Sequence, residues 1–323
     1  MVLMHTGGGN LSYSLPAGGG LFGVDTHTGV VHTLALLDRE AQAQHEFVVF
    51  VTDGQNQADS CLVLVWLLDA NDQSPEFDDS CRGLSVPENG PPEVHAMVAW
   101  DRDEGSNARL LYSIAAGNVG DKFRLEPRTG RLLTSTPLDR ESVSEYRLTV
   151  LATDQGSPAR TGSCTLVVTV VDENDEPPRF EQAVYSASVA EDAAPNTTVL
   201  AVRAHDPDLG LGGRVSYSLA NETAALFRID SDTGVLTTTG LFDREKRASY
   251  TFEVLASDNG RYQAHWAHAR VQVTVVDVND NSPRFLEFPY VAHISPHAPL
   301  GSQVALVQAH DGDDGPNADV FYT

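Results

Sequence analysis

Short runs of apolar and β-branched residues, separated by polar turns, follow one another along the whole chain. Several of these runs have a period of two, so that Leu148, Val150 and Ala152 fall on one face of a strand. No stretch of useful length has a helical period. The pattern therefore predicts an all-β fold, and its clearest region has strands at residues 83–89, 93–100, 108–114, 122–125, 131–135, 145–154 and 163–172.

Three acidic segments follow apolar runs and are similar to one another. They read DANDQSPEF, DENDEPPRF and DVNDNSPRF, and they begin at Asp69, Asp172 and Asp277. A DRE motif precedes each segment, a DxD motif follows it, and a turn containing Thr-Gly also recurs. The order and spacing of these motifs predict a tandem repeat of about 104 residues.

Each repeat has the size and strand rhythm of an immunoglobulin-like sandwich. Seven short strands in about 104 residues are typical of that fold, and the Thr-Gly pairs predict tight hairpins with glycine at positive φ. We predict tandem seven-stranded Greek-key sandwiches in a linear rod. The proline-rich ends of the acidic segments predict a partial repeat, two complete repeats and a second partial repeat, at residues 1–75, 76–178, 179–283 and 284–323. We expect only residues 76–283 to fold independently, because each end piece lacks most of a sandwich.

The chain is strongly acidic, with 45 Asp and Glu residues against 21 Lys and Arg residues and a net charge of −24. Nucleic acid and anionic membranes repel such a surface, so neither is expected as a partner. No apolar stretch is long enough to span a bilayer, and the N-terminal segment lacks the features of a signal peptide. The sequence predicts no direct membrane insertion of this segment.

The recurring acidic motifs predict bound cations. Their side chains offer only carboxylate and amide oxygens, which suit the flexible cages of six to eight ligands around Ca²⁺ better than Mg²⁺ or Zn²⁺ sites. If the acids of adjoining repeats converge, their repulsion has to be offset by cations. An EF-hand is excluded, because the twelfth residue counted from each DxD motif is a tyrosine and not glutamate: Tyr112, Tyr217 and Tyr322.

The combined motif set resembles the extracellular repeats of the cadherin family. PEN (with Glu88), DRE, DxND, DxD and AxDxG occur in this order and period along the whole chain. Within the family, the resemblance is strongest to long non-classical members such as Dachsous, Fat and the protocadherins. It implies about three Ca²⁺ ions at each complete junction between successive sandwiches.

The resemblance also assigns ligands at three junctions. At the first junction they are Asp38, Glu40, Asp69, Asn71, Asp72, Asp101, Asp103 and Asp154. At the second junction they are Glu88, Asp139, Glu141, Asp172, Asn174, Asp175, Asp206, Asp208 and Asp258, with the carbonyl of Glu173. At the third junction they are Glu191, Asp243, Glu245, Asp277, Asn279, Asp280, Asp311 and Asp313.

In function, the resemblance implies a segment of a calcium-dependent cell–cell adhesion ectodomain. It would lie on the extracellular side of the plasma membrane, as part of a single-pass membrane protein. Other cadherin ectodomains on an apposed cell, of the same or a related type, would be its partners. A soluble or cleaved calcium-dependent module for ligand binding or signalling is the alternative.

Enzymatic activity is not expected. Asp139 and Glu141 could be the paired carboxylates of a glycosidase, but their repetition with the other motifs favours a metal site. His45 and Glu46 begin an HExxH zinc motif, in which Val49 occupies the position of the second histidine.

The remaining candidates are cysteines, tryptophans and sequons. Cys61 and Cys164 occupy equivalent places in two repeats and are not expected to pair, whereas Cys81 and Cys164 fall in one repeat and could bridge its first and last strands. Two unpaired thiols are the expectation for that second pair. The tryptophans are expected in the core or at strand edges, and not as adhesive anchors: Trp66, Trp100 and Trp266. Three sequons predict N-glycosylation, at Asn10, Asn196 and Asn221.

Overall fold

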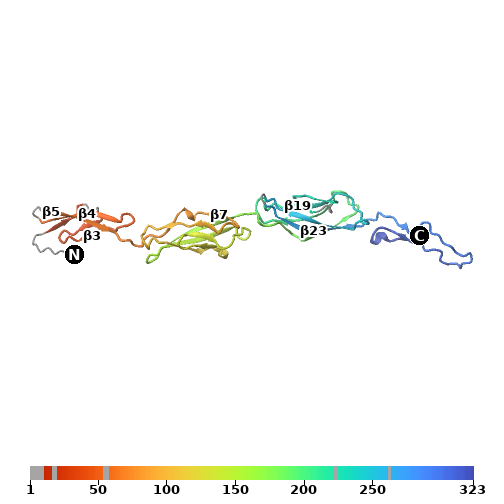
Figure 1. Ribbon diagram of the computed structural model, residues 1–323, viewed down its shortest axis with the longest axis horizontal. Coiled ribbons are helices and arrows are strands. Elements are labelled where there is room, and N and C mark those ends of the chain that lie inside the picture. Colours follow the sequence, from red (N-terminus) through yellow and green to blue (C-terminus); the bar gives the residue numbers. More distant parts are fainter. Residues whose placement is uncertain (1–10, 17–19, 54–57, 221–224, 261–262) are drawn as a thin grey trace. The chain divides into compact units, whose positions relative to one another are not determined.

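The structure is a computed structural model that describes residues 11–16, 20–53, 58–220, 225–260 and 263–323 (Figure 1). The chain divides into two compact units, Met1–Val171 and Asp172–Thr323. Strands make up nearly all of the regular structure in both units, with only short 3₁₀ turns beside them. The predicted all-β class is confirmed.

In the first unit, the second repeat is a sandwich of a four-stranded and a three-stranded sheet. The strand orders are β10-β13-β14-β7 and β11-β12-β8. Strand β7 pairs with β14 in parallel, and the other pairs are antiparallel. All seven predicted strands are present, with bounds β7 Leu84–Pro87, β8 Glu93–Ala96, β10 Leu111–Ala116, β11 Phe123–Leu125, β12 Arg131–Thr134, β13 Glu145–Thr153 and β14 Thr161–Val171. Short elements accompany them: β6 Glu76–Phe77, which pairs with β9 Ala99–Trp100, and the 3₁₀ turns η1 Asp79–Cys81 and η2 Val119–Asp121.

Alternation along the β13–β14 hairpin builds the core of this sandwich. Leu148 is paired with Leu166 in the register, and both are fully buried, as are Val150 and Val168. Residues that alternate with them, such as Thr165 and Thr169, are exposed. Full burial of one aliphatic side chain stabilises a fold by about 1.5–3 kcal/mol, so the inward-facing residues hold the two sheets together.

In the second unit, the third repeat has the same architecture. Its sheets have the orders β16-β23-β22-β19 and β17-β21-β20, and β16 pairs with β23 in parallel. Val254 and Val271 are fully buried in its core, as Val150 and Leu166 are in the second repeat. The strand bounds are β15 Arg179–Phe180, β16 Val184–Ala190, β17 Thr198–Ala201, β18 Ala204–His205, β19 Ser216–Leu219, β20 Phe227–Ile229, β21 Val235–Thr238, β22 Ser249–Ser257 and β23 Trp266–Val276.

The two end segments contain fewer strands. The first repeat has a sheet of order β1-β4-β5 and a β2–β3 hairpin, with Phe22 and Phe47 buried between them. Its strands are β1 Ser12–Ser14, β2 Phe22–Val24, β3 Val31–Thr33, β4 Gln44–Thr52 and β5 Ala58–Trp66. The fourth repeat has the paired strands β24 Arg284–Phe285 and β25 Ala309–His310 and the 3₁₀ turn η4 Gly315–Ala318.

The Thr-Gly turns have the predicted backbone conformation. Gly130, between β11 and β12, has φ of 69°, and Gly234, between β20 and β21, has φ of 68°. At both positions an added Cβ would also collide with a backbone carbonyl, that of Met97 or Val202. Glycine is therefore required for the turn and for the close approach of the neighbouring chain.

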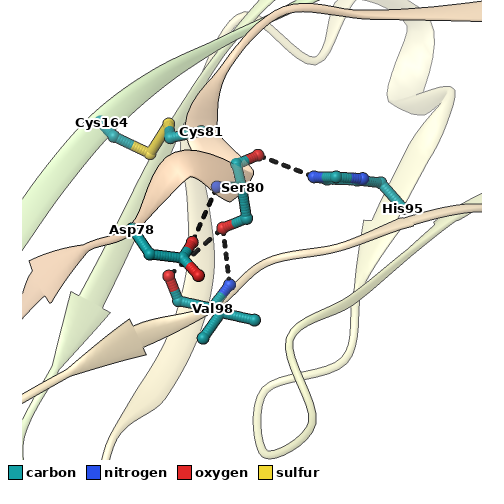
Figure 2. Close-up of a disulfide and its surroundings, with 6 residues drawn as sticks. All are labelled: Asp78, Ser80, Cys81, His95, Val98 and Cys164. Carbon is teal, nitrogen blue, oxygen red and sulfur yellow. Dashed lines mark hydrogen bonds between the residues drawn. A yellow bond between two sulfur atoms is a disulfide. The ribbon is translucent and has the colours of Figure 1, made fainter.

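A disulfide joins Cys81 in η1 to Cys164 in β14 (Figure 2). The expectation of two unpaired thiols was wrong, because η1 places Cys81 beside the inward face of β14. Hydrogen bonds hold η1 in place: the carboxylate of Asp78 accepts from the amide of Ser80 at 2.7 Å, and the Ser80 hydroxyl accepts from the amide of Val98 at 2.8 Å. Cys61 is unpaired and exposed among the described residues.

The three tryptophans do not lie in a core. Trp66, Trp100 and Trp266 are 67%, 43% and 62% exposed, so the part of the expectation that placed them in a core was wrong. Of the sequons, Asn196 is exposed in a turn with φ of 69°. Asn10 and Asn221 lie outside the described residues.

Candidate metal centres

The acidic segments lie where the last strand of each repeat ends. They begin at Asp69, Asp172 and Asp277, within three residues of the ends of β5, β14 and β23. The prolines come at the far end of each segment, directly before the short strands β6, β15 and β24. The carboxylates are therefore carried by the loop that leaves each sandwich.

The first cluster joins residues of the first and second repeats within one unit. Oxygens of Glu40, Asp69 and Asp103 lie within 4.8 Å of one another. Asp69 also accepts hydrogen bonds from the amide of Glu104 at 3.1 Å and from the Asn107 side chain at 2.8 Å. The DRE motif and acidic segment of one repeat thus meet the DxD motif of the next.

Buried oxygens without hydrogen-bond partners lie in this first cluster. They are Oδ1 of Asn71, Oδ2 of Asp101 and Oδ1 of Asp103. Burial, and then the neighbouring carboxylates of Asp101 and Asp69, raise the pKa of Asp103, which is only 5% exposed. Buried polar atoms in native proteins nearly always have a partner. A set of buried oxygens that repel one another and lack donors fits a cation.

In the first unit, the carboxylates of Glu88, Asp139 and Glu141 lie within 4.8 Å of one another. Glu88 is 1% exposed and accepts a hydrogen bond from the amide of Arg140 at 2.8 Å. Burial and the negative charge of Glu88 raise the pKa of Glu141 to about 7. The second repeat therefore brings these three predicted ligands together by itself.

In the second unit, a further group of the predicted ligands lies together: Asp172, Asn174, Asp206, Asp208 and Asp258. Asp172 accepts from the amide of Leu209 at 3.1 Å, and Asn174 donates to Asp258 at 3.1 Å. Asp208 donates its amide to Asp206 at 3.0 Å. Burial, and then the charge of Asp206, raise the pKa of Asp208 to about 6. Unpartnered buried oxygens recur here, on Asn174, Asp206 and Asp208.

The third cluster, in the second unit, has two overlapping groups. Glu191, Glu245 and Asp280 lie within 4.8 Å of one another, and so do Glu245, Asp277 and Asp313. Glu191 accepts from the amide of Val278 at 2.7 Å, and the amide of Asp313 donates to Asp311 at 3.2 Å. Burial, followed by the charge of Glu191, raises the pKa of Asp280. The acids assigned to the third and fourth repeats therefore converge.

Some predicted ligands have other partners or stand apart. The carboxylate of Asp38 accepts from the amide of Ala41 at 3.0 Å, and Asp139 and Asp243 form the same bond with Ser142 and Lys246, so these three also cap the turn after DRE. Asp72 accepts from the side chain of Gln73 at 2.8 Å. Asn279 is exposed and has no hydrogen-bond partner among the described residues. Asp154 accepts from Asn71 at 3.2 Å, and the charge of Asp175 helps to raise the pKa of Asp208.

The arginine of each DRE motif is a site residue that the sequence reasoning missed. Arg39 lies 2.7 Å from Asp69 and 2.7 Å from Glu104, and Arg244 lies 2.5 Å from Asp277. Arg140 is paired with Glu141. These guanidinium groups offset part of the repulsion between the carboxylates. The constant Arg of the repeated motif was the signal that could have found them.

Glycine of the AxDxG motif is required by the same clusters. A Cβ at Gly156 would collide with the side chain of Asn71, and a Cβ at Gly260 would collide with that of Asn174. The asparagines of the first two DxND segments, Asn71 and Asn174, therefore pack directly on the backbone that follows Asp154 and Asp258.

The fold and these clusters define the class of the protein. The cadherin domain model matches residues 5–68, 82–171 and 185–276, and the chain belongs to the cadherin family. Cadherin ectodomains are adhesion proteins and not enzymes, and this chain, as a member of the family, is not an enzyme. Cadherin repeats are generally calcium-binding, in agreement with the acidic clusters.

Individual relatives narrow the resemblance to the long non-classical cadherins, which confirms that prediction. The chain is 43% identical to "Protein dachsous" of Drosophila melanogaster over 97% of its length and 39% identical to "Protocadherin Fat 4" of Mus musculus over 94%. These matches cover 10% and 6% of the two relatives. The chain therefore spans only a small part of the curated relatives it matches.

Solved protocadherin ectodomains share the architecture. The protocadherin gammaB7 EC3-6 cis-dimer structure has a TM-score of 0.83 at 32% identity, covering 97% of this chain and 79% of that one. The protocadherin gammaB4 extracellular domain has a TM-score of 0.81 at 30% identity, covering 96% and 51%. Among the described residues of this chain, no helix is long and apolar enough to cross a membrane.

Proposed function

We propose that the chain is a segment of a calcium-dependent cell–cell adhesion ectodomain. In this proposal, Ca²⁺ ions at the junctions between repeats restrict the motion of successive sandwiches. The three junctions would lie between the successive repeats 1–75, 76–178, 179–283 and 284–323, with about three ions at each complete junction. The ligands would be the carboxylates and amides assigned to the three junctions above.

One observation carries the proposal: the first cluster draws Glu40 and Asp69 from one repeat and Asp103 from the next to within 4.8 Å. Two unit charges at that distance repel by about 0.9 kcal/mol in water and by about 3.5 kcal/mol at an effective dielectric constant of 20. A divalent ion turns this repulsion into attraction, and it binds only when both repeats are in place. The ion therefore couples the orientation of one sandwich to that of the next.

Calcium is the ion that this ligand set favours. The first cluster contains carboxylate and amide oxygens, and neither Cys nor His is among its proposed ligands, which disfavours zinc. The number of oxygens and their placement on flexible loops suit the six to eight ligands of Ca²⁺ better than the strict octahedron of Mg²⁺. Extracellular sites of this kind bind at about 10⁻⁴ to 10⁻³ M.

The partners would be other cadherin ectodomains of the same or a related type on an apposed cell. The solved fragment of protocadherin gammaB7 is a cis-dimer, which supports cadherin ectodomains as partners. The chain would act on the extracellular side of the plasma membrane, within a longer single-pass membrane protein. In the alternative, the chain belongs to a soluble or cleaved calcium-dependent module that binds a ligand.

Bead aggregation separates these two functions. The chain is coupled to beads by its C-terminus, and clustering is followed in about 2 mM calcium and in chelator. If the segment is adhesive, beads that carry it should cluster in calcium but not in chelator. The clustering occurs among these beads or with beads that carry a related cadherin ectodomain. Calcium binding without clustering of either kind would favour the soluble module and would contradict the adhesive proposal.

A further inference from the structure

The sheet β1-β4-β5 of the first repeat has an apolar outer face. Phe47 is buried in the interior and is paired with Val63 in the register. Because side chains alternate along a strand, the neighbours on β4 and β5 point the other way, to solvent. Five of them form what we call the outer stripe: Val48, Phe50, Leu62, Leu64 and Trp66.

The outer stripe is open in the described structure. Trp66 is 67% exposed, Leu62 53%, Leu64 48% and Phe50 39%. Register pairs Val48 with Leu62, and Phe50 follows Val48 two residues along β4 on the same face, so the apolar side chains continue from one strand to the next. Large exposed apolar patches are uncommon on monomeric proteins and mark interaction surfaces.

The other repeats carry mostly polar residues on the same face. Counted from the acidic segments, the three stripe positions of β5 correspond to Thr165, Val167 and Thr169 in β14 and to Arg270, Gln272 and Thr274 in β23. Charged side chains also lie on those two faces: Arg147 forms an ion pair with Glu145 at 2.7 Å, and Glu253 lies 3.8 Å from His268. The other two repeats keep only separate apolar residues on this face, Leu151 and Val167 in the second and Leu255 in the third. The continuous apolar stripe is therefore a feature of the first repeat.

The size of the outer stripe matches a small homodimer interface. An aromatic side chain has about 150–250 Å² of surface, so the exposed fractions of the stripe amount to on the order of 400 Å². Two copies together would bury about 800 Å² of apolar surface. Specific interfaces begin at roughly 1,200 Å² of total buried surface, and about 65% of a homodimer interface is apolar. The apolar area of two stripes therefore matches a homodimer interface at the small end of this range.

We propose that the outer stripe is a self-association surface, which packs face to face on the outer stripe of a second copy of this chain. Phe50 and Trp66 lie at opposite ends of the stripe, with Leu62 and Leu64 between them. A two-fold axis that crosses the stripe at a right angle places each Phe50 against the Trp66 of the other copy. The leucines then meet at the centre, as in an isologous interface.

Glu46 distinguishes this arrangement from a basic partner. It is paired with Leu64 in the register and therefore lies beside the stripe on the same face. The described residues include no ion pair of Glu46. The two-fold axis places both copies of Glu46 on the same side of the interface, where their charges oppose association. Glu46→Gln should therefore strengthen self-association two- to tenfold, whereas it would weaken binding to a basic partner.

Sedimentation equilibrium of the whole chain in about 2 mM calcium tests the proposal. The main variant combines Leu62→Thr, Leu64→Val and Trp66→Thr, which are the residues of the second repeat at these positions. The matched control is Trp266→Thr, which removes a tryptophan of similar exposure from the third repeat. The wild-type chain should dimerise reversibly, the triple variant should weaken dimerisation at least tenfold, and the control should leave it unchanged.

Circular dichroism and thermal unfolding of the variants separate a lost contact from a lost fold, and the exposed positions should leave both signals unchanged. A wild-type chain that is monomeric at all concentrations would overturn the proposal, and the stripe would then have to bind a different partner. Association that persists in the triple variant, or that is lost equally in the control, would also overturn it. Weaker association of Glu46→Gln would contradict the two-fold arrangement.

Discussion

Replacing one buried carboxylate of the first cluster should stabilise the chain without calcium and reduce the stabilisation that calcium adds. The change is Asp103→Asn, which keeps the size of the side chain and the oxygen that accepts the amide of Gln73 at 3.2 Å. It removes one of three carboxylates that lie within 4.8 Å of one another, on a residue that is buried. Only the charge, and with it a calcium ligand, is changed.

Without calcium the variant should be more stable than the wild type. Two of the three repulsive pairs disappear, each worth at least about 0.9 kcal/mol at 4.8 Å. Arg39 already offsets part of the charge on Asp69 and Glu40. We expect a gain of about 1–2 kcal/mol, which raises the Tm of a domain of this size by roughly 4–15 °C.

Calcium should stabilise the variant less than it stabilises the wild type. At about 2 mM calcium, a site with a Kd near 10⁻⁴ M stabilises the fold by about 1.8 kcal/mol, and a site ten times weaker by about 0.7 kcal/mol. The calcium-induced rise in Tm should therefore fall to less than half of the wild-type value.

Differential scanning calorimetry in chelator and in calcium measures both effects. Glu76→Gln is the control, because Glu76 is exposed, carries the same charge and belongs to none of the clusters. The control should leave the calcium increment unchanged. A lower Tm of Asp103→Asn in chelator, together with an unchanged calcium increment, would refute the reasoning.

Three further predictions follow from the same structure. In chelator, the chain should be more stable near pH 5 than near pH 8. The pKa values of Glu141 and Asp208 are raised in the folded state, to about 7 and about 6. The folded state therefore holds protons that the unfolded chain has already lost, and its stability falls as the pH rises through this window. A Tm that rises from pH 5 to pH 8 in chelator would contradict this. Removing the disulfide with Cys81→Ser and Cys164→Ser should destabilise the second repeat by about 2–4 kcal/mol, because the bridge closes a long loop of sequence separation 83; an unchanged unfolding midpoint in denaturant would count against it. Leu148→Ala should cost about 2–5 kcal/mol by the same assay, because its side chain is fully buried, and a loss below about 1 kcal/mol would show that the hairpin core is wrongly placed.

The strands of the second repeat could be predicted from the sequence because apolar alternation directly reports which face is buried. Leu148 and Leu166 follow a period of two, and the structure pairs them in the core. The Thr-Gly turns could be predicted for an equally local reason, since Gly130 needs a positive φ that other residues rarely adopt.

Features that depend on packing between distant segments were harder to predict. Cys81 and Cys164 are 83 residues apart, and only the position of η1 beside β14 brings their sulfurs together. Trp66 was expected in the core or at an edge because tryptophan is largely apolar, whereas the register of β5 places it on the outer face. The metal clusters could be predicted in part. Repetition revealed their carboxylates, but the guanidinium of Arg39 became visible as a site residue only once its distance to Asp69 was known.

Small-angle X-ray scattering of the whole chain tests most directly whether calcium couples successive repeats. The profile is recorded in about 2 mM calcium, then after addition of excess chelator, and again after calcium is restored. The account predicts a narrow distribution of maximum dimensions in calcium, a broad one in chelator, and full recovery on return. Superimposable profiles in calcium and chelator, from a chain that stays folded in both, would contradict it.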